Sequence, residues 1–154
     1  MQVWVDADAC PAEIKDLLFR AAKPTQIKVT LVANQPMRTP RSEFIDSLLV
    51  PAGLNVADQR IVELTEEGDL VVTADIPLAA QVVEKGGQAL NPRGALYTAE
   101  NIGQRLAVRD LMDDLRGEGQ ITGGPANFNA KDRQAFANQL DRWLTAARKK
   151  RPKG

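Results

Sequence analysis

Short apolar runs rich in β-branched residues alternate along the chain with stretches in which apolar residues recur every three or four positions. The first pattern is typical of buried strands and the second of amphipathic helices. Strands are predicted at 2–5, 27–33, 44–50 and 69–73. Helices are predicted at 11–22, 55–68, 77–85 and 99–116, and from a cap at Asn129 onward. The run at 44–50 also suits a short helix, but the strand is favoured because Pro51 and Gly53 end it.

Strands that alternate with helices predict an α/β domain in which a mostly parallel sheet is covered on both faces. The two helices near the C-terminus are expected to pack over that sheet. Residues 1–147 are predicted to form one domain, and 148–154 a basic, disordered tail with five lysines and arginines. Such a tail is either a solvated terminus or a segment that contacts phosphates.

The 154-residue chain contains no histidine, which narrows the chemistry available to it. Ser-His-Asp and Cys-His catalysis, histidine-ligated zinc and imidazole general bases are all excluded. The single cysteine, Cys10, rules out an intrachain disulfide and suits a reducing compartment. Without a secretory signal or a membrane-spanning apolar run, the expected location is cytoplasmic, with no membrane partner. Cys10 itself is expected to pack as a small hydrophobe.

Carboxylates follow two of the predicted strands. Asp6 and Asp8 end the first apolar run, and Asp75 comes directly after LVVTA. If the first strand continued through Asp8, both acids would lie on one face. Asp58 lies on the helix after Asn55 and shares a face with apolar neighbours, so it is expected to point inward. Because the carboxyl ends of parallel strands meet at one edge, these acids predict a Mg²⁺ or Mn²⁺ site.

Each of these acids has a simpler interpretation. Asp6 or Asp8 could cap the helix that begins near Pro11, and Asp75 could cap the helix at Pro77. Asp69 precedes its strand, so it is expected at the opposite edge of the sheet and is left out of the site.

Positive side chains are expected at the same edge as the carboxylates. Arg38 and Arg41 lie in the loop after the second strand, and Arg93 lies in the turn NPRG. Arginines around a metal-bound carboxylate cluster suit a phosphodiester substrate. The alternative is that they only balance the acidic charge.

Several motifs together resemble the YaiI/YqxD family of small bacterial proteins. They are VDADACP, SEFID, VADQRIVE, GDLVVTADIPLA, NPRG with the following YTAENI, and GGPANF, and they span Met1 to about Leu144. The resemblance implies a PIN-like domain, the three-layer α/β/α fold of metal-dependent nucleases related to the FLAP endonucleases. It implies metal ligation by Asp6, Asp58 and Asp75, with Thr73-Ala74-Asp75 as the TxD motif. A further acid of many PIN sites falls on Ile76, Pro77 or Leu78 here.

The leading hypothesis is therefore a Mg²⁺- or Mn²⁺-dependent nuclease whose partner is nucleic acid, RNA more than DNA. Asp6, Asp58 and Asp75 would hold the ion, Asp8 would assist, and the three arginines and Thr73 would contact substrate. One alternative is a haloacid dehalogenase-type phosphatase with Asp6 as nucleophile and Asp8 as general acid. Such a phosphatase also needs a pair of acids after a later strand. The candidate pair, Asp113-Asp114, lies instead inside a long predicted helix. The other is a non-catalytic module that binds metal or nucleic acid.

Overall fold

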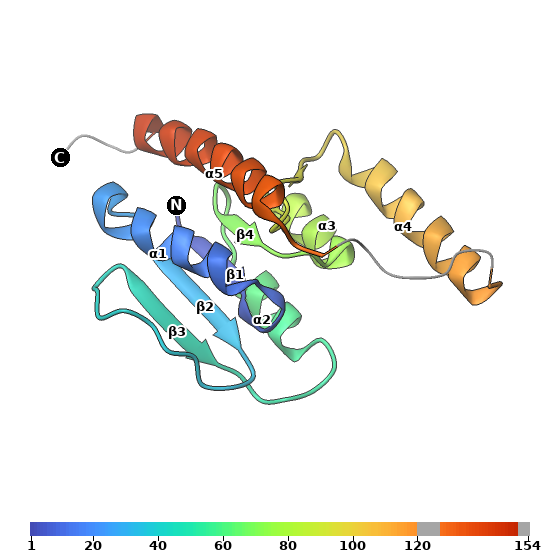
Figure 1. The fold of residues 1–154 in the computed structure, drawn as a ribbon, viewed down its shortest axis with the longest axis horizontal. Helices are drawn as coiled ribbons and strands as arrows, with labels where there is room; N and C mark the ends of the chain where they lie inside the picture. Colours follow the sequence, from blue (N-terminus) through green and yellow to red (C-terminus); the bar gives the residue numbers. More distant parts are fainter. Residues whose placement is uncertain (120–126, 151–154) are drawn as a thin grey trace.

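The computed structural model describes residues 1–119 and 127–150, which form one six-stranded sheet with helices on both faces (Figure 1). The strands are β1 (Val3–Asp6), β2 (Val29–Ala33), β3 (Ile45–Leu49), β4 (Leu70–Val72), β5 (Gln88–Leu90) and β6 (Leu96–Tyr97). Their order is β3-β2-β1-β4-β5-β6, and only β6 runs antiparallel to its neighbour. The predicted mostly parallel α/β architecture is confirmed.

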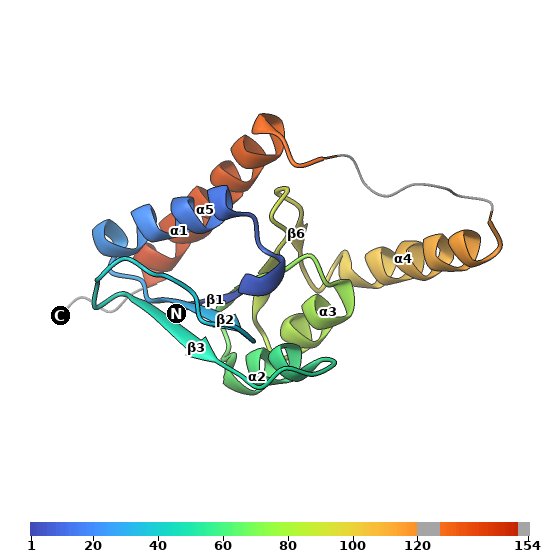
Figure 2. The same cartoon turned by 60° about the horizontal axis from the view of Figure 1, so that its bottom comes forward.

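The helices form the two outer layers of the domain. They are α1 (Ala12–Thr25), α2 (Val56–Leu64), α3 (Ile76–Glu84), α4 (Ile102–Gly117) and α5 (Ala130–Lys150). In Figure 2, α1 and α5 lie over one face of the sheet, and α2 and α3 lie under the other. The two faces have separate cores, because alternate residues of β1 point to opposite sides: Val3 and Val5 join the first core and Trp4 the second.

The chain changes direction across the sheet between β1 and β4. From β1 it builds outward through β2 and β3, then returns to pair β4 with the free side of β1. Such a reversal leaves a crevice at the carboxyl ends of the two strands, where ligands bind in open α/β sheets. Asp6 ends β1 and Asp75 follows β4, so both acids lie at this point.

Some predicted boundaries and contacts were wrong. The helix α2 ends at Leu64 rather than Gly68, because the Thr65 hydroxyl donates to the Ile61 carbonyl (2.6 Å) and Thr65 is extended. The helix α5 continues to Lys150, so Arg148 and Lys149 are helical rather than part of a disordered tail. Residues 151–154 of that predicted tail lie outside the described residues.

The prediction that both late helices pack over the sheet is confirmed for α5 and wrong for α4. Figure 2 shows α4 extending away from the sheet, with only its first turns near α3. None of its residues is buried, and Val108, Leu111 and Met112 are 47%, 54% and 38% exposed. An amphipathic pattern predicts that a helix has an apolar face, but it does not say what covers that face.

A close approach fixes the turn between β5 and β6. Gly94 has φ +98°, and a Cβ placed on it would lie 2.5 Å from the Ala135 Cβ of α5. Both the left-handed backbone and the contact require glycine here. The turn is thereby held against α5, and it carries Arg93 at a defined position.

Asp69 lies at the opposite edge of the sheet from the candidate site, as predicted. It is 3% exposed and accepts three hydrogen bonds, from the backbone N–H groups of Gln2 and Glu66 (2.9 Å each) and from the Trp4 indole (3.0 Å). Its role is therefore structural, because it joins the start of β1 to the turn before β4.

No helix in residues 1–119 and 127–150 has the length and apolar character needed to span a bilayer.

Candidate functional site

Thr73 connects the carboxyl ends of β1 and β4. It is 1% exposed, and its hydroxyl donates a hydrogen bond to Oδ2 of Asp6 (3.0 Å). The Thr73 hydroxyl oxygen also accepts a hydrogen bond from the backbone N–H of Asp75 (3.0 Å). A hydroxyl that donates to one acid and accepts from the backbone of the other fixes their relative position. The structure therefore gives Thr73 a positioning role, while its predicted contact with substrate stays a prediction.

Asp75 is the N-cap of α3, as the simpler interpretation predicted. Its Oδ1 accepts the backbone N–H of Leu78 (2.9 Å). Asp6 and Asp8 do not cap α1, because the residue before that helix is Pro11 and no side chain caps it. Capping therefore accounts for one of the three strand-end acids and leaves the other two without that explanation.

The carboxyls of Asp6, Asp58 and Asp75 come from three elements and influence one another. Partial burial is the main cause that raises the pKa of Asp58 to about 6; the charges of Asp75 and Asp6 and a hydrogen bond with Asp75 raise it further. Burial also raises the pKa of Asp6, the Thr73 hydroxyl opposes the rise, and Asp75 and Asp8 add to it. The prediction that Asp58 points inward toward the strand-end acids is thus supported by its half-buried position and by this interaction.

Asp8 lies beside this group but makes a different contact. The strand β1 ends at Asp6, and Asp8 is in a 3₁₀ turn at Ala7–Ala9, so the condition under which both acids would share a strand face is not met. Its exposed carboxylate accepts the backbone N–H of Asn34 at the end of β2 (2.9 Å). Asp8 therefore adds negative charge near Asp6 and also fixes the neighbouring loop.

The donor set suits a hard divalent cation. Mg²⁺ is usually held by one or two carboxylates, with waters and substrate phosphates completing its shell. The described residues contain no ready-made group of three or more acidic, cysteine or histidine side chains that could hold a metal ion. Two of the three carboxylates, together with water and substrate oxygens, would complete the ligand shell of Mg²⁺ or Mn²⁺. These residues therefore suit an ion that binds together with the substrate. Ligation by all three stays a prediction.

The structure separates the three predicted arginines. Arg38 and Arg41 are exposed in the loop between β2 and β3, and neither hydrogen-bonds nor ion-pairs with the carboxylates in residues 1–119 and 127–150. Arg93 is half-buried, and its guanidinium pairs with Asp132 of α5 (2.9 Å). The part of each arginine in substrate binding stays a prediction.

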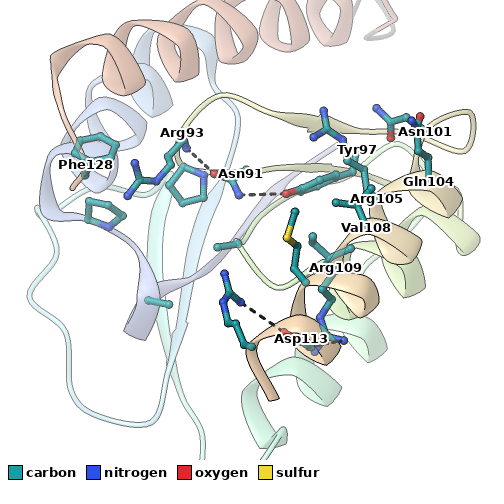
Figure 3. A pocket seen from close by; sticks show the side chains of 17 residues that line it. Asn91, Arg93, Tyr97, Asn101, Gln104, Arg105, Val108, Arg109, Asp113 and Phe128 are labelled. Atoms are coloured by element: carbon teal, nitrogen blue, oxygen red, sulfur yellow. Dashed lines mark hydrogen bonds and ion pairs between the residues drawn. The ribbon is translucent and has the colours of Figure 1, made fainter. Parts of the chain in front are cut away.

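Beside the carboxylates lies a groove of about 930 Å³ between α4 and the β5–β6 turn. Figure 3 shows Asn91 and Arg93 of the turn, with Arg105, Val108 and Arg109 of α4 around the same space. Ala74 and Ile76, which flank Asp75 in the chain, also line it. The sequence interpretation missed the arginines of α4. The signal was their spacing, since positions 105, 109 and 116 fall on one face of a helix.

Cys10 takes no part in this chemistry. It is buried in the core under α1, as predicted, and burial is the main cause that raises the pKa of its thiol to about 12. Only the thiolate is a good nucleophile, so this cysteine is unreactive at neutral pH.

We expect the Asp58 carboxyl to titrate near pH 6, and Asp75→Asn to lower that value because it removes a neighbouring negative charge. A pKa raised on folding stabilises the protein at low pH, and this contribution is lost as the pH rises from 3.8 through about 6. Carbon-detected NMR of the side-chain carboxyl measures the titration directly. A curve for Asp58 that is the same in wild type and Asp75→Asn would contradict the proximity of the two groups.

Comparisons with known proteins match the chain over almost its whole length. A family model described as "Uncharacterized BCR, YaiI/YqxD family" covers residues 4–146. A UPF0178 protein of Syntrophotalea carbinolica is 63% identical over 145 residues, which are 94% of this chain and 98% of that protein. A UPF0178 protein of Pectobacterium atrosepticum is 60% identical over 149 residues, 97% of this chain and 99% of the relative. No solved structure was found to match. The chain belongs to the YaiI/YqxD family.

Proposed function

We propose that this protein is a Mg²⁺- or Mn²⁺-dependent nuclease that hydrolyses phosphodiester bonds, in RNA more than in DNA. The observation that carries the proposal is the meeting of acids from three elements at the point where the sheet changes direction. Thr73 links Asp6 to Asp75 there, and the negative charges of Asp75 and Asp6 help to raise the pKa of Asp58 of α2. Helix capping explains only Asp75.

The side chains have separate tasks in this proposal. Asp6 and Asp75 present oxygens whose spacing Thr73 fixes, and Asp58 supplies a third acid that is partly protonated near pH 6. A divalent ion, when bound, activates water and stabilises the leaving oxygen. Asp58 would lose its proton as that positive charge arrives, since an opposite charge favours the ionised form. The resemblance to PIN-like nucleases supports the same assignment of residues.

A cleavage assay tests the proposal. Purified protein is mixed with labelled single-stranded, hairpin and duplex RNA and DNA in Mn²⁺, Mg²⁺ or EDTA, alongside Asp75→Asn and Asp46→Asn. Asparagine is also a good N-cap, so Asp75→Asn removes the charge but keeps the start of α3. Asp46 is an exposed acid on β3 and serves as the matched control. We expect cutting that needs metal, is lost in Asp75→Asn and persists in Asp46→Asn.

Cutting that is equal in all three proteins would come from a contaminant and would refute the nuclease. Metal-dependent binding of nucleic acid without any cutting would instead favour the non-catalytic module. The apolar residues Ile76 and Leu78 support that alternative, because they follow Asp75 where many PIN sites have a further acid. The phosphatase alternative has less support. Asp113 of its required acidic pair is exposed on α4 and ion-pairs with Arg109 and Arg116 (3.5 and 3.6 Å).

A further inference from the structure

The groove between α4 and the β5–β6 turn has a strong positive bias. Four arginines and one aspartate line it: Arg93, Arg105, Arg109, Arg116 and Asp113. Three of these arginines already have carboxylate partners, but Arg105 has none among the described residues. Arg109 pairs with Asp110 (3.1 Å) as well as with Asp113. Exposed ion pairs within one helix contribute little free energy, so Arg109 and Arg116 can exchange these carboxylates for a phosphate at small cost.

The groove also borders the candidate site. Ala9 follows Asp8, while Ala74 and Ile76 stand on either side of Asp75, and all three line the groove. A chain of phosphates bound to the arginines of α4 would therefore pass beside the carboxylates. Several arginines along a groove that borders the site point to a ligand with several phosphates in a row rather than to an isolated anion.

Besides the polar side chains of Asn91, Asn101 and Gln104, most of the remaining wall is apolar. Ile76, Pro92 and Phe128 lie on the domain side, and Val108 and Met112 lie on α4. A duplex turns its bases inward and offers mainly phosphates and sugars to a protein surface, so few of its bases could pack against these apolar side chains. Unpaired bases, in contrast, pack against apolar and aromatic side chains while arginines bind the backbone.

We infer that this groove binds an unpaired polynucleotide strand and guides it to the carboxylates; the inference rests on the proposed function and names its substrate class. The arginines of α4 contact phosphates, and the bases lie against Val108, Met112 and Phe128. From Asn101 to Arg116 the groove follows α4 for about 22 Å, at about 1.5 Å per residue. That length suits about four nucleotides, the short end of the range for single-strand sites.

Binding measured without catalysis tests this inference separately from the nuclease. Fluorescence anisotropy in EDTA would follow labelled oligouridylate, oligothymidylate and a duplex of equal length, at several salt concentrations. The variant is Arg105→Glu, and the matched control is Arg20→Glu, which reverses an exposed arginine of α1 that lies outside the groove. We expect both single strands to bind more tightly than duplex. The two single strands reveal whether the 2′-hydroxyl contributes.

Arg105→Glu should weaken single-strand binding by about fivefold or more at 0.1 M salt and lower the salt slope by about 0.7, the contribution of one phosphate contact. Arg20→Glu should bind like wild type. Equal affinities of the two variants, or duplex binding as tight as single-strand binding, would overturn the inference. So would sedimentation showing that a second copy occupies the groove and that Met112→Glu dissociates it. Cleavage that persists while Arg105→Glu has no effect would leave the nuclease standing and remove only this groove.

Discussion

Asp6→Asn is expected to reduce metal-dependent cleavage by about 100-fold or more without lowering the stability of the fold. The catalytic loss follows from the several kcal/mol that a correctly held ion contributes to the transition state, since each 1.4 kcal/mol is about tenfold in rate. Asparagine keeps an oxygen that can accept the Thr73 hydroxyl, so the contact between β1 and β4 is preserved. Only the negative charge is removed.

The stability part of this prediction distinguishes a functional acid from a structural one. Burial and neighbouring acids raise the pKa of Asp6, so its ionised form disfavours the native state at neutral pH. A raised native pKa means that stability is lost as the pH rises through that value, and the neutral amide avoids this loss. Thermal unfolding at pH 7 should therefore give an equal or higher melting temperature for Asp6→Asn. A melting temperature several degrees below wild type would assign Asp6 a structural role instead.

Asp69→Ala is expected to have the opposite signature, a large loss of stability with no direct effect on chemistry. Removing this carboxylate leaves the Trp4 indole and the backbone N–H groups of Gln2 and Glu66 without their acceptor. Unpaired buried donors cost about 1–3 kcal/mol each, partly relieved by water at the exposed ends, so we expect a total of about 3 kcal/mol.

Urea denaturation followed by tryptophan fluorescence measures this change, with Asp46→Ala as the control. Asp46 is an exposed acid whose side chain is 62% accessible in its ion pair with Lys28, so its removal should cost less than about 1 kcal/mol. If the two variants were equally stable, the three hydrogen bonds of Asp69 would not be the link between β1 and the turn before β4.

The sequence was most informative where one local pattern determines one structure. The alternation of short apolar runs with amphipathic segments predicted β1 to β4 and all five helices, and the placement of acids after strands predicted that Asp6 and Asp75 would meet. Asp69 was assigned correctly to the other edge because it precedes β4. These are consequences of chain direction in a parallel sheet, which a sequence reveals directly.

What escaped prediction depends on contacts between distant segments. The strand β6 has only two residues and exists because Leu96 and Tyr97 pair with β5. A 3₁₀ turn takes Asp8 out of the strand, and its carboxylate accepts the backbone N–H of Asn34, a residue 26 positions away in the chain. The arginines of α4 were not predicted as site residues, because they line a groove only when the β5–β6 turn lies opposite them. That turn is held against α5 at Gly94, a contact between distant segments of the chain.

The exposure of α4 has a consequence for the timescale on which this part of the molecule opens. A helix with no buried residue gains little from tertiary packing, and isolated helices of its length are marginal in water. Its amides, beyond the first turn that packs near α3, should exchange with solvent through local unfolding long before those of β1 or β4. The domain thus combines a rigid sheet that holds the carboxylates with a labile wall whose ordering would be coupled to whatever it binds.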